Sequence, residues 1–225
     1  PNEQKSYFRA SYGDYSEVVS HAYSGGKLNF GGGQLGYLLE VFDHRSDGWK
    51  NLNMAPLNMV NQEMPISKTD MNFKLGYEFA SGGYLEFKYG NTFMDSDVSY
   101  QGEPDLATFN SSPYSVPFTA AWDNMDSHQH RYYLRYLTEF SENVGLTTTL
   151  FHNEFNRNWY KMNSESEATF GSTPTGDFTW TNKNNNRNYK TTGLQGNVDI
   201  LLGANDIDLG FRIMKEDYTQ NPYTV

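Results

Sequence analysis

The segment from Asp70 to Met94 alternates between apolar and polar residues with a period of two. In its first arm the odd positions 71–79 are apolar or aromatic, and the even positions 70–78 are polar or glycine. The second arm repeats the alternation, and Ser81-Gly82-Gly83 between the arms suits the positive φ angles of a tight turn. A helix would spread such residues around its whole circumference. Because successive side chains of a strand point to opposite faces, the segment predicts a β-hairpin with one apolar face.

The same pattern recurs along the chain and predicts nine strands. They cover residues 4–12, 15–24, 35–44, 70–79, 84–94, 129–140, 146–162, 188–202 and 207–218. The second is expected to end in Gly25-Gly26, and the third could extend back to Leu28. The alternation of the seventh is poor after Leu150. From the second strand onward, short turns alternate with long polar loops. The turns are expected near Gly31-Gly32-Gly33, Ser81-Gly82, Asn143 and Ala204-Asn205. The loops cover residues 45–68, 95–127 and 163–187, and the last contains Asn184-Asn185-Asn186.

Short connections at one end and long ones at the other are typical of an outer-membrane barrel. The predicted fold class is therefore all-β, an antiparallel up-and-down transmembrane β-barrel, partial, with about nine strands. The alternative is a soluble sheet or sandwich, in which the apolar faces would share one core; alternation alone does not separate the two. Strands longer than the usual five to six residues favour the membrane. Aromatic residues near strand ends, such as Tyr12, Phe42 and Trp49, do so as well.

Composition narrows the classes of function. The chain has 225 residues, no cysteine, and 27 acidic against 17 basic residues, which gives a net charge of −10. Absence of cysteine excludes disulfide scaffolds and thiolate sites, and the acidity argues against nucleic acid as a partner. Only 37% of residues are hydrophobic although 16% are aromatic, which suits a sheet with one apolar and one wet face. The sequence has no apolar run of about 18 residues, so no transmembrane helix is predicted.

Four stretches resemble the barrel of a known family. They are Ser-Tyr-Gly-Asp-Tyr at 11–15, Leu-Leu-Glu-Val-Phe-Asp-His-Arg-Ser-Asp-Gly-Trp at 38–49, Asn-Phe-Lys-Leu-Gly-Tyr at 72–77, and Phe-Asn-Arg-Asn-Trp-Tyr-Lys at 155–161. The first three resemble the first loop, third strand and fourth strand of the barrel of TonB-dependent outer-membrane receptors, just after the plug. The last is similar to receptors of the ferric-dicitrate type. Together the resemblance covers nearly the whole chain.

The resemblance implies a barrel of about 22 strands with a plug in its lumen. We therefore expect residues 1–225 to be a partial β-barrel domain that lacks the plug, the TonB box and the closing strands. It also implies a place in the bacterial outer membrane, in contact with its lipid. The implied function is uptake of a ferric chelate, such as ferric citrate or another siderophore, driven by the TonB–ExbB–ExbD complex through regions outside this chain. Neither enzyme activity nor a cofactor is expected.

Five side chains are candidates for ligand contact: Arg157, Arg131, Arg135, His44 and Arg45. Arg157 lies in the family-like stretch near the third long loop, and a guanidinium suits the carboxylates of an anionic chelate. Arg131 and Arg135 share one face of the sixth strand. For each arginine the alternative is structural pairing with a neighbouring carboxylate.

No catalytic set and no metal site is predicted. His128 and His130 form a His-x-His pair, which we interpret as an accident of a strand edge, and no nucleophile motif occurs. A different function class stays open, namely a soluble or surface β-sheet protein that binds carbohydrate through Trp49, Trp122 and Trp180. Such a protein would be folded and monomeric in plain buffer, without detergent.

Overall fold

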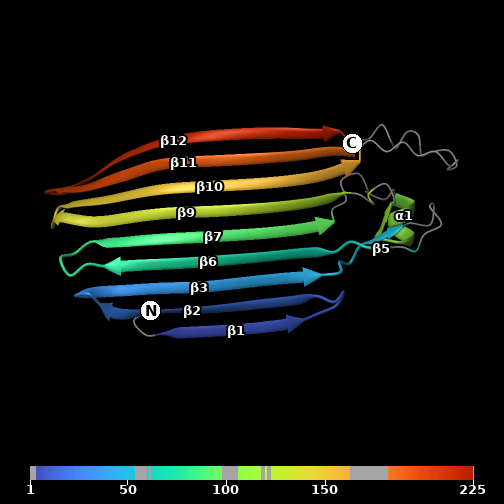
Figure 1. The fold of residues 1–225 in the computed structure, drawn as a ribbon, viewed down its shortest axis with the longest axis horizontal. Helices are drawn as coiled ribbons and strands as arrows, with labels where there is room; N and C mark the ends of the chain where they lie inside the picture. The colour runs from blue at the N-terminus through green and yellow to red at the C-terminus, as the bar shows by residue number, and fades with distance from the viewer. Residues whose placement is uncertain are drawn as a thin grey trace.

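The chain forms one long antiparallel sheet in the computed structural model, which describes residues 4–53, 60, 62–97, 106–117, 120, 123–162 and 182–224. Nine strands lie side by side in the order β1-β2-β3-β6-β7-β9-β10-β11-β12 (Figure 1). Each strand of this sheet therefore pairs with the sheet strands before and after it along the chain, which is the up-and-down arrangement.

The strands of the sheet become longer toward the C-terminal side. They are β1 (Lys5–Tyr12), β2 (Val18–Phe30), β3 (Gly33–Ser46), β6 (Ile66–Glu78), β7 (Tyr84–Asp97), β9 (Asn124–Ser141), β10 (Val144–Met162), β11 (Asn182–Leu202) and β12 (Asn205–Thr224). The long connections contain β4 (Asn51–Asn53), β5 (Gln62–Glu63), α1 (Leu106–Ser111) and β8 (Ser115–Pro117). Among the described residues no helix has the length and apolar character to cross a membrane.

The nine predicted strands are confirmed, with two corrections. The second strand does not end at Gly25-Gly26 but runs to Phe30, so Leu28 belongs to β2 and not to the third strand. The turn falls at Gly31 and Gly32, whose φ angles are 58° and 84°, where the sequence predicts it. Residues 182–187, predicted as the end of a loop, belong to β11. The sequence of that part of β11 is polar at every position, so the alternation that marks a half-apolar strand is missing there.

The two ends of the sheet differ in their connections (Figure 1). At one end, which we call the short-turn end, tight hairpins join β2 to β3, β6 to β7, β9 to β10 and β11 to β12. Gly82 and Gly83 have φ angles of 81° and 94°, as the Ser-Gly-Gly motif predicts. At the other end, the loop end, lie the β1–β2 turn and the long connections. The expected asymmetry of short turns and long loops is therefore present.

The register gives the sheet two chemically different faces. Residues directly opposite each other on neighbouring strands share a face. One row across seven strands is entirely large and apolar: Tyr37, Leu75, Phe87, Leu134, Leu150, Leu194 and Ile213. We call the side of this row the apolar face. The residues next to the row point to the polar face, for example Lys74, Lys88 and Arg135.

The apolar residues form a band that crosses the sheet obliquely. On β3 the band reaches Val41 toward the loop end, but the residue in the same row on β12 is Asp217. On β12 the band ends earlier, at Ile213. On β1 the residue in the row of Val41 is Phe8, and the band continues beyond it to Tyr12. With about 3.3 Å per residue and 4.8 Å per strand, the band is inclined by roughly 25–35° to the rows.

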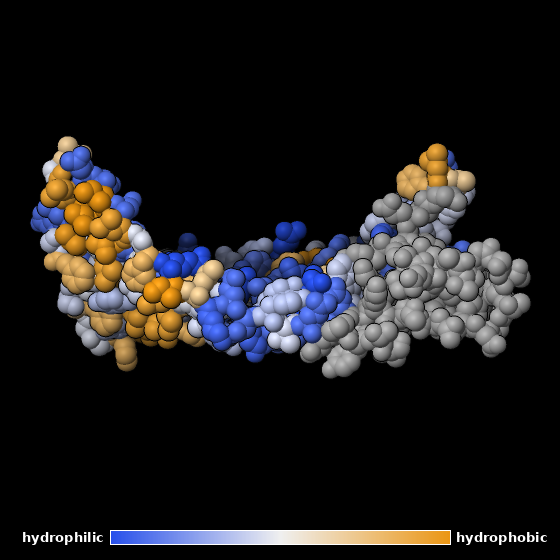
Figure 2. Space-filling view, turned by 90° about the horizontal axis from the view of Figure 1, so that it is seen from above, coloured by the Kyte–Doolittle hydropathy of each residue, from blue (hydrophilic) through white to orange (hydrophobic). Residues whose placement is uncertain are grey.

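No second layer covers the apolar face of the described sheet. Leu134, Leu209 and Ile213 are 43%, 58% and 70% exposed. Figure 2, seen from the β12 edge, shows hydrophobic residues gathered toward the short-turn end and hydrophilic residues farther along the strands. In the described part of the chain the hydrophobic core cluster lies elsewhere, at Leu52, Met64, Val116 and Ala120. The sandwich alternative, which requires two packed sheets with a shared core, is therefore not supported.

A second, small sheet ties two long connections together at the loop end. β4 pairs antiparallel with β5 and parallel with β8, and the core cluster just named belongs to this assembly. Trp49 packs edge-on against Tyr114, with ring centroids 5.8 Å apart. We call β4, β5, β8 and this core the loop unit. Segments predicted as polar loops are thus partly folded against each other.

Candidate functional site

Four cationic side chains line one hollow on the polar face. They are Lys88 of β7, Arg131 and Arg135 of β9, and Arg212 of β12, around a volume of about 300 Å³. The strands between β9 and β12 contribute uncharged side chains to this hollow, among them Thr149. Cations from the two sides therefore face the same space with no carboxylate among the lining residues.

Hydroxyl groups and an aromatic ring hold the two arginines of β9. Arg131 donates a hydrogen bond from Nη2 to Oγ1 of Thr92 at 3.3 Å, and Arg135 donates from Nε to Oγ1 of Thr149 at 3.4 Å. The guanidinium of Arg135 also lies over the ring of Tyr133, 5.1 Å from its centroid. Such contacts orient a guanidinium without cancelling its charge.

The carboxylate opposite Arg135 is engaged elsewhere. Glu86 of β7 accepts hydrogen bonds from the hydroxyls of Tyr133 and Tyr84, the latter at 3.1 Å, and lies 3.8 Å from the ammonium of Lys74. These three partners occupy the oxygens of Glu86. The positive charge of Arg135 is therefore not taken up in an ion pair.

On the C-terminal side of the sheet, the two faces differ in whether their cationic side chains form ion pairs. On the apolar face the cations form ion pairs: Lys190 with Glu154 at 2.9 Å and Lys215 with Asp217 at 2.8 Å. On the polar face, the described arginines of β9–β12 form none: Arg131, Arg135, Arg157, Arg187 and Arg212. These five arginines therefore make no direct ion pair within the described residues, although the chain as a whole is acidic.

Nearer the loop end, Arg157 of β10 lies directly opposite Arg187 of β11. The guanidinium of Arg157 stands over the ring of Trp159 at 5.0 Å, and its Nε is buried without a hydrogen-bond partner. Arg187 donates from Nε to Oδ1 of Asn185 at 2.8 Å and from Nη1 to the hydroxyl of Tyr189 at 3.5 Å. Both side chains are partly exposed on the polar face.

His44 lies at the loop end, where β3 approaches the β1–β2 turn. Its Nε2 is 2.9 Å from Oε1 of Glu17, and both residues line a hollow of about 730 Å³ beside the loop unit. Trp49 and Lys50 line the same hollow, with the Lys50 ammonium 5.4 Å from the Trp49 ring centroid. In the described ranges no three His, Asp or Glu side chains gather closely enough to hold a metal ion.

The structure brings some of the predicted site residues together and separates others. Arg131 and Arg135 share the polar face and one hollow, as the alternation indicated. Arg157 is on the same face but four rows nearer the loop end, or about 13 Å along the strands. His44 lies at the loop end, whereas Arg45 points to the apolar face and pairs with Asp43, with 3.0 Å between Nε and Oδ1. Contact with a ligand stays a prediction for all five.

Sequence reasoning missed three cations of the polar face. Lys88 and Arg212 line the hollow with the two arginines of β9, and Arg187 faces Arg157. The alternation on the predicted strands indicates that Lys88 and Arg212 lie on the polar face, because both neighbours of each residue lie on the apolar face. Arg187 had no such signal, since its segment reads as loop. Of the tryptophans of the carbohydrate alternative, Trp122 and Trp180 lie outside the described residues.

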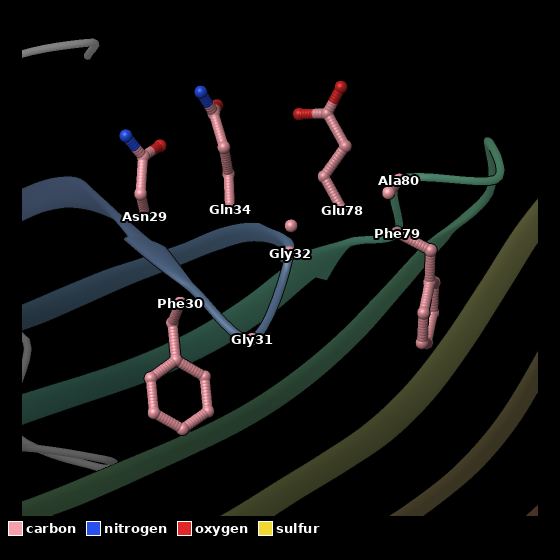
Figure 3. Close-up of a pocket in the computed structure, with 9 residues that line it drawn as sticks. Asn29, Phe30, Gly31, Gly32, Gln34, Glu78, Phe79 and Ala80 are labelled. Atoms are coloured by element: carbon pink, nitrogen blue, oxygen red, sulfur yellow. The ribbon is translucent and has the colours of Figure 1, made fainter.

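A hollow of about 650 Å³ at the short-turn end shows the alternation of faces directly (Figure 3). It lies between the β2–β3 and β6–β7 hairpins. Asn29, Gln34 and Glu78 point to one side there, and Phe30 and Phe79 point to the other. The hollow is lined by no cation, so it is not part of the arginine site.

Comparison with known proteins concerns the fold. No protein-family model matches the chain, and no curated protein matches its sequence. Among solved structures, the chain is similar to the ferric-catecholate import receptor Fiu from E. coli K12 in its open form, with a TM-score of 0.68 and 14% sequence identity. The match covers 99% of this chain and 35% of that chain. At this identity it shows the fold, namely that the nine strands are arranged as part of a β-barrel.

Proposed function

We propose that this chain is part of an outer-membrane β-barrel receptor that imports a ferric chelate. The structural likeness to a ferric-catecholate import receptor supports a transport protein rather than an enzyme. The four sequence stretches that resemble TonB-dependent receptors support energy coupling through TonB. On this proposal the plug and the remaining strands belong to other parts of the protein, and ferric citrate is one candidate cargo.

The oblique apolar band supports a position in a lipid bilayer. Strands of membrane barrels are tilted by about 35–45°, so a horizontal lipid layer meets each successive strand at a shifted residue. The shift from Val41 on β3 to Ile213 on β12 has this form. The exposed leucines and aromatic residues of the band would be costly in water but suit lipid tails.

The lengths of the strands support a barrel that extends beyond the lipid at the loop end. β9, β10, β11 and β12 have 18, 19, 21 and 20 residues, whereas a tilted strand crosses the bilayer in about 9–11. Beyond the band, the apolar face turns polar, with the Glu154–Lys190 ion pair on β10 and β11. In outer-membrane barrels the long loops lie outside the cell, so this part would face the medium.

The observation that carries the choice of ligand is the group of arginines without direct ion pairs on the polar face, which lines the bore on this proposal. Guanidinium groups free of carboxylates attract anions and hold oxygen ligands by charge-assisted hydrogen bonds. Arg131 and Arg135, together with Lys88 and Arg212, would attract an anionic iron complex within the bore. Arg157 and His44 lie nearer the loop end, where the ligand would enter.

The test is iron uptake by cells that carry the complete receptor with Arg131→Gln and Arg135→Gln. A hydrogen bond to a charged group contributes about 1.5–3 kcal/mol, so we expect the initial rate of radioactive ferric citrate uptake, at subsaturating ligand, to fall at least about tenfold. Lys215→Gln, on the apolar face of β12, is the matched control and should import at the normal rate. Undiminished import of every anionic ferric chelate by the double variant, at normal surface abundance, would remove the polar-face arginines from the transport path.

A further inference from the structure

We infer that Arg157 and Arg187 form a two-arginine site for an anion that carries a planar aromatic group. The inference rests on the proposed import of a ferric chelate and specifies the chemistry of that chelate. It concerns the loop-end part of the polar face, about 13 Å along the strands from Arg131, and it adds Arg187 to the residues predicted from the sequence.

The two arginines are a like-charge pair in the middle of a row without acids. The row across β9, β10, β11 and β12 reads Ser127, Arg157, Arg187 and Gln220. Residues directly opposite on neighbouring strands have Cβ atoms about 4.5–5.5 Å apart, and like charges there are destabilising. Neither arginine is in an ion pair within the described residues. An anion between them would relieve the repulsion and satisfy the buried Nε of Arg157.

The opposite face of the same two strands shows the normal arrangement. Glu154 of β10 and Lys190 of β11 are also directly opposite each other, and they form an ion pair at 2.9 Å. They lie three residues from Arg157 and Arg187 along their strands. One strand pair thus matches opposite charges on the apolar face and like charges on the polar face. Opposite-charge pairing therefore does not occur at the two arginines, and an external anion would supply the missing partner.

Aromatic rings surround the pair and define the second part of the ligand. Directly below it lies the row Phe155, Tyr189 and Tyr218, with centroids 6.1 Å and 5.1 Å apart, the first two stacked at 24°. Trp159 lies against Arg157 on the other side. Ring faces favour planar aromatic groups by offset stacking, and two guanidinium forks suit adjacent oxygens. A catecholate chelate meets both requirements, but an aliphatic carboxylate such as citrate meets only one.

The experiment is a binding titration on the complete receptor in detergent, followed by quenching of tryptophan fluorescence. The two probes are ferric tris(catecholate) and ferric citrate. We expect Arg157→Gln and Arg187→Gln each to weaken binding of the catecholate at least about tenfold. The double variant should lose little more than either single one, because one bridging anion couples the two side chains. Tyr189→Leu should weaken the catecholate and leave citrate within about twofold, because only the catecholate stacks.

The controls separate this inference from the proposed function. Lys190→Gln, on the other face of β11, should bind both probes as the unaltered receptor does. Without ligand, Arg157→Gln should raise the midpoint of thermal unfolding, because the repulsion from Arg187 and a buried donor without a partner are both removed; a purely structural arginine would lower it. If the unaltered receptor binds and imports no ferric chelate, the proposed function fails. If it binds them but the arginine variants bind equally well, or citrate depends on Tyr189 as strongly as catecholate does, only the present inference fails.

Discussion

Leu134→Lys tests whether the apolar face meets lipid. Leu134 lies on the apolar face of β9 midway between Phe140 and His128, about 20 Å from each along the strand. At a tilt of about 40°, each separation corresponds to about 15 Å along the membrane normal. Leu134 is therefore near the centre of an apolar layer about 25–30 Å thick.

The expected cost follows from this depth. A lysine at the midplane of the lipid face of a barrel costs about 2–4 kcal/mol. Leu137→Lys is the matched control, because it is the same change on the same strand but on the polar face, where Leu137 lies opposite Tyr84 and Thr147. Its ammonium would reach the water of the bore, so we expect a cost below about 1 kcal/mol.

The assay is reversible urea unfolding of the complete receptor in lipid vesicles, with folding followed by gel mobility. With a denaturant slope of about 1–3 kcal/mol per molar urea, Leu134→Lys should lower the midpoint by about 1 M or more. Leu137→Lys should leave it nearly unchanged. If the two variants lose equal stability, or if Leu137→Lys loses more, the assignment of the apolar face to lipid is wrong.

Three further predictions address the hairpins, the loop unit and the tilt. Gly33→Ala would press its methyl group against a backbone carbonyl of β6, so the free energy of unfolding should fall by about 1–3 kcal/mol; Gly36→Ala, which meets only ordinary contacts, should leave it unchanged in the same urea titration. Val116→Ala removes a buried side chain of the loop unit; limited proteolysis should then cut the connections of the loop unit sooner and leave the barrel strands intact. Because the chain has no cysteine, single labels at Val41→Cys and Asp217→Cys are clean probes, and the first should report lipid and the second water although both lie in one row; equal environments would exclude the tilt.

The strands and their two faces were predictable because apolar and polar residues alternate along a strand that has one apolar face. From Asp70 to Tyr89, apolar and polar residues alternate with few interruptions, and the glycines of the turn at Gly82-Gly83 have the positive φ angles that their sequence indicates. Beyond Leu150 on β10, and in the first residues of β11, this signal disappears. On β10 the positions of the apolar face become polar, while aromatic residues such as Phe155 and Trp159 lie on the polar face, and the first residues of β11 are polar at every position. The usual alternation is therefore lost, and the strands are fixed only by pairing with their neighbours.

The site was only half predictable for a related reason. The alternation places Arg131 and Arg135 on one face of their strand. The other residues that line the hollow come from other strands, and which of them lie nearby depends on the register between strands, which the sequence does not reveal. Arg212 of β12 lines the same hollow as the arginines of β9, and the residues of β10 and β11 that lie between them in the hollow are uncharged. The loop unit was not predictable at all, since β4 and β8 are three residues each and pair across more than sixty residues of sequence.

The two faces of this sheet differ in how their charges are paired, and the proposed anion site accounts for the difference. On the polar face Arg157 and Arg187 form a like-charge pair. Favourable cross-strand pairs contribute about 0.2–1 kcal/mol each, and like charges directly opposite are destabilising; an effect of this order is small beside the stability of a long barrel. An unpaired guanidinium contributes about 1.5–3 kcal/mol to holding an anion. On the apolar face, where Glu154 and Lys190 lie next to the apolar band, a free charge offers no such gain, and the two residues form an ion pair. A bore that takes up an anion and releases it is a place where arginines without ion pairs are useful.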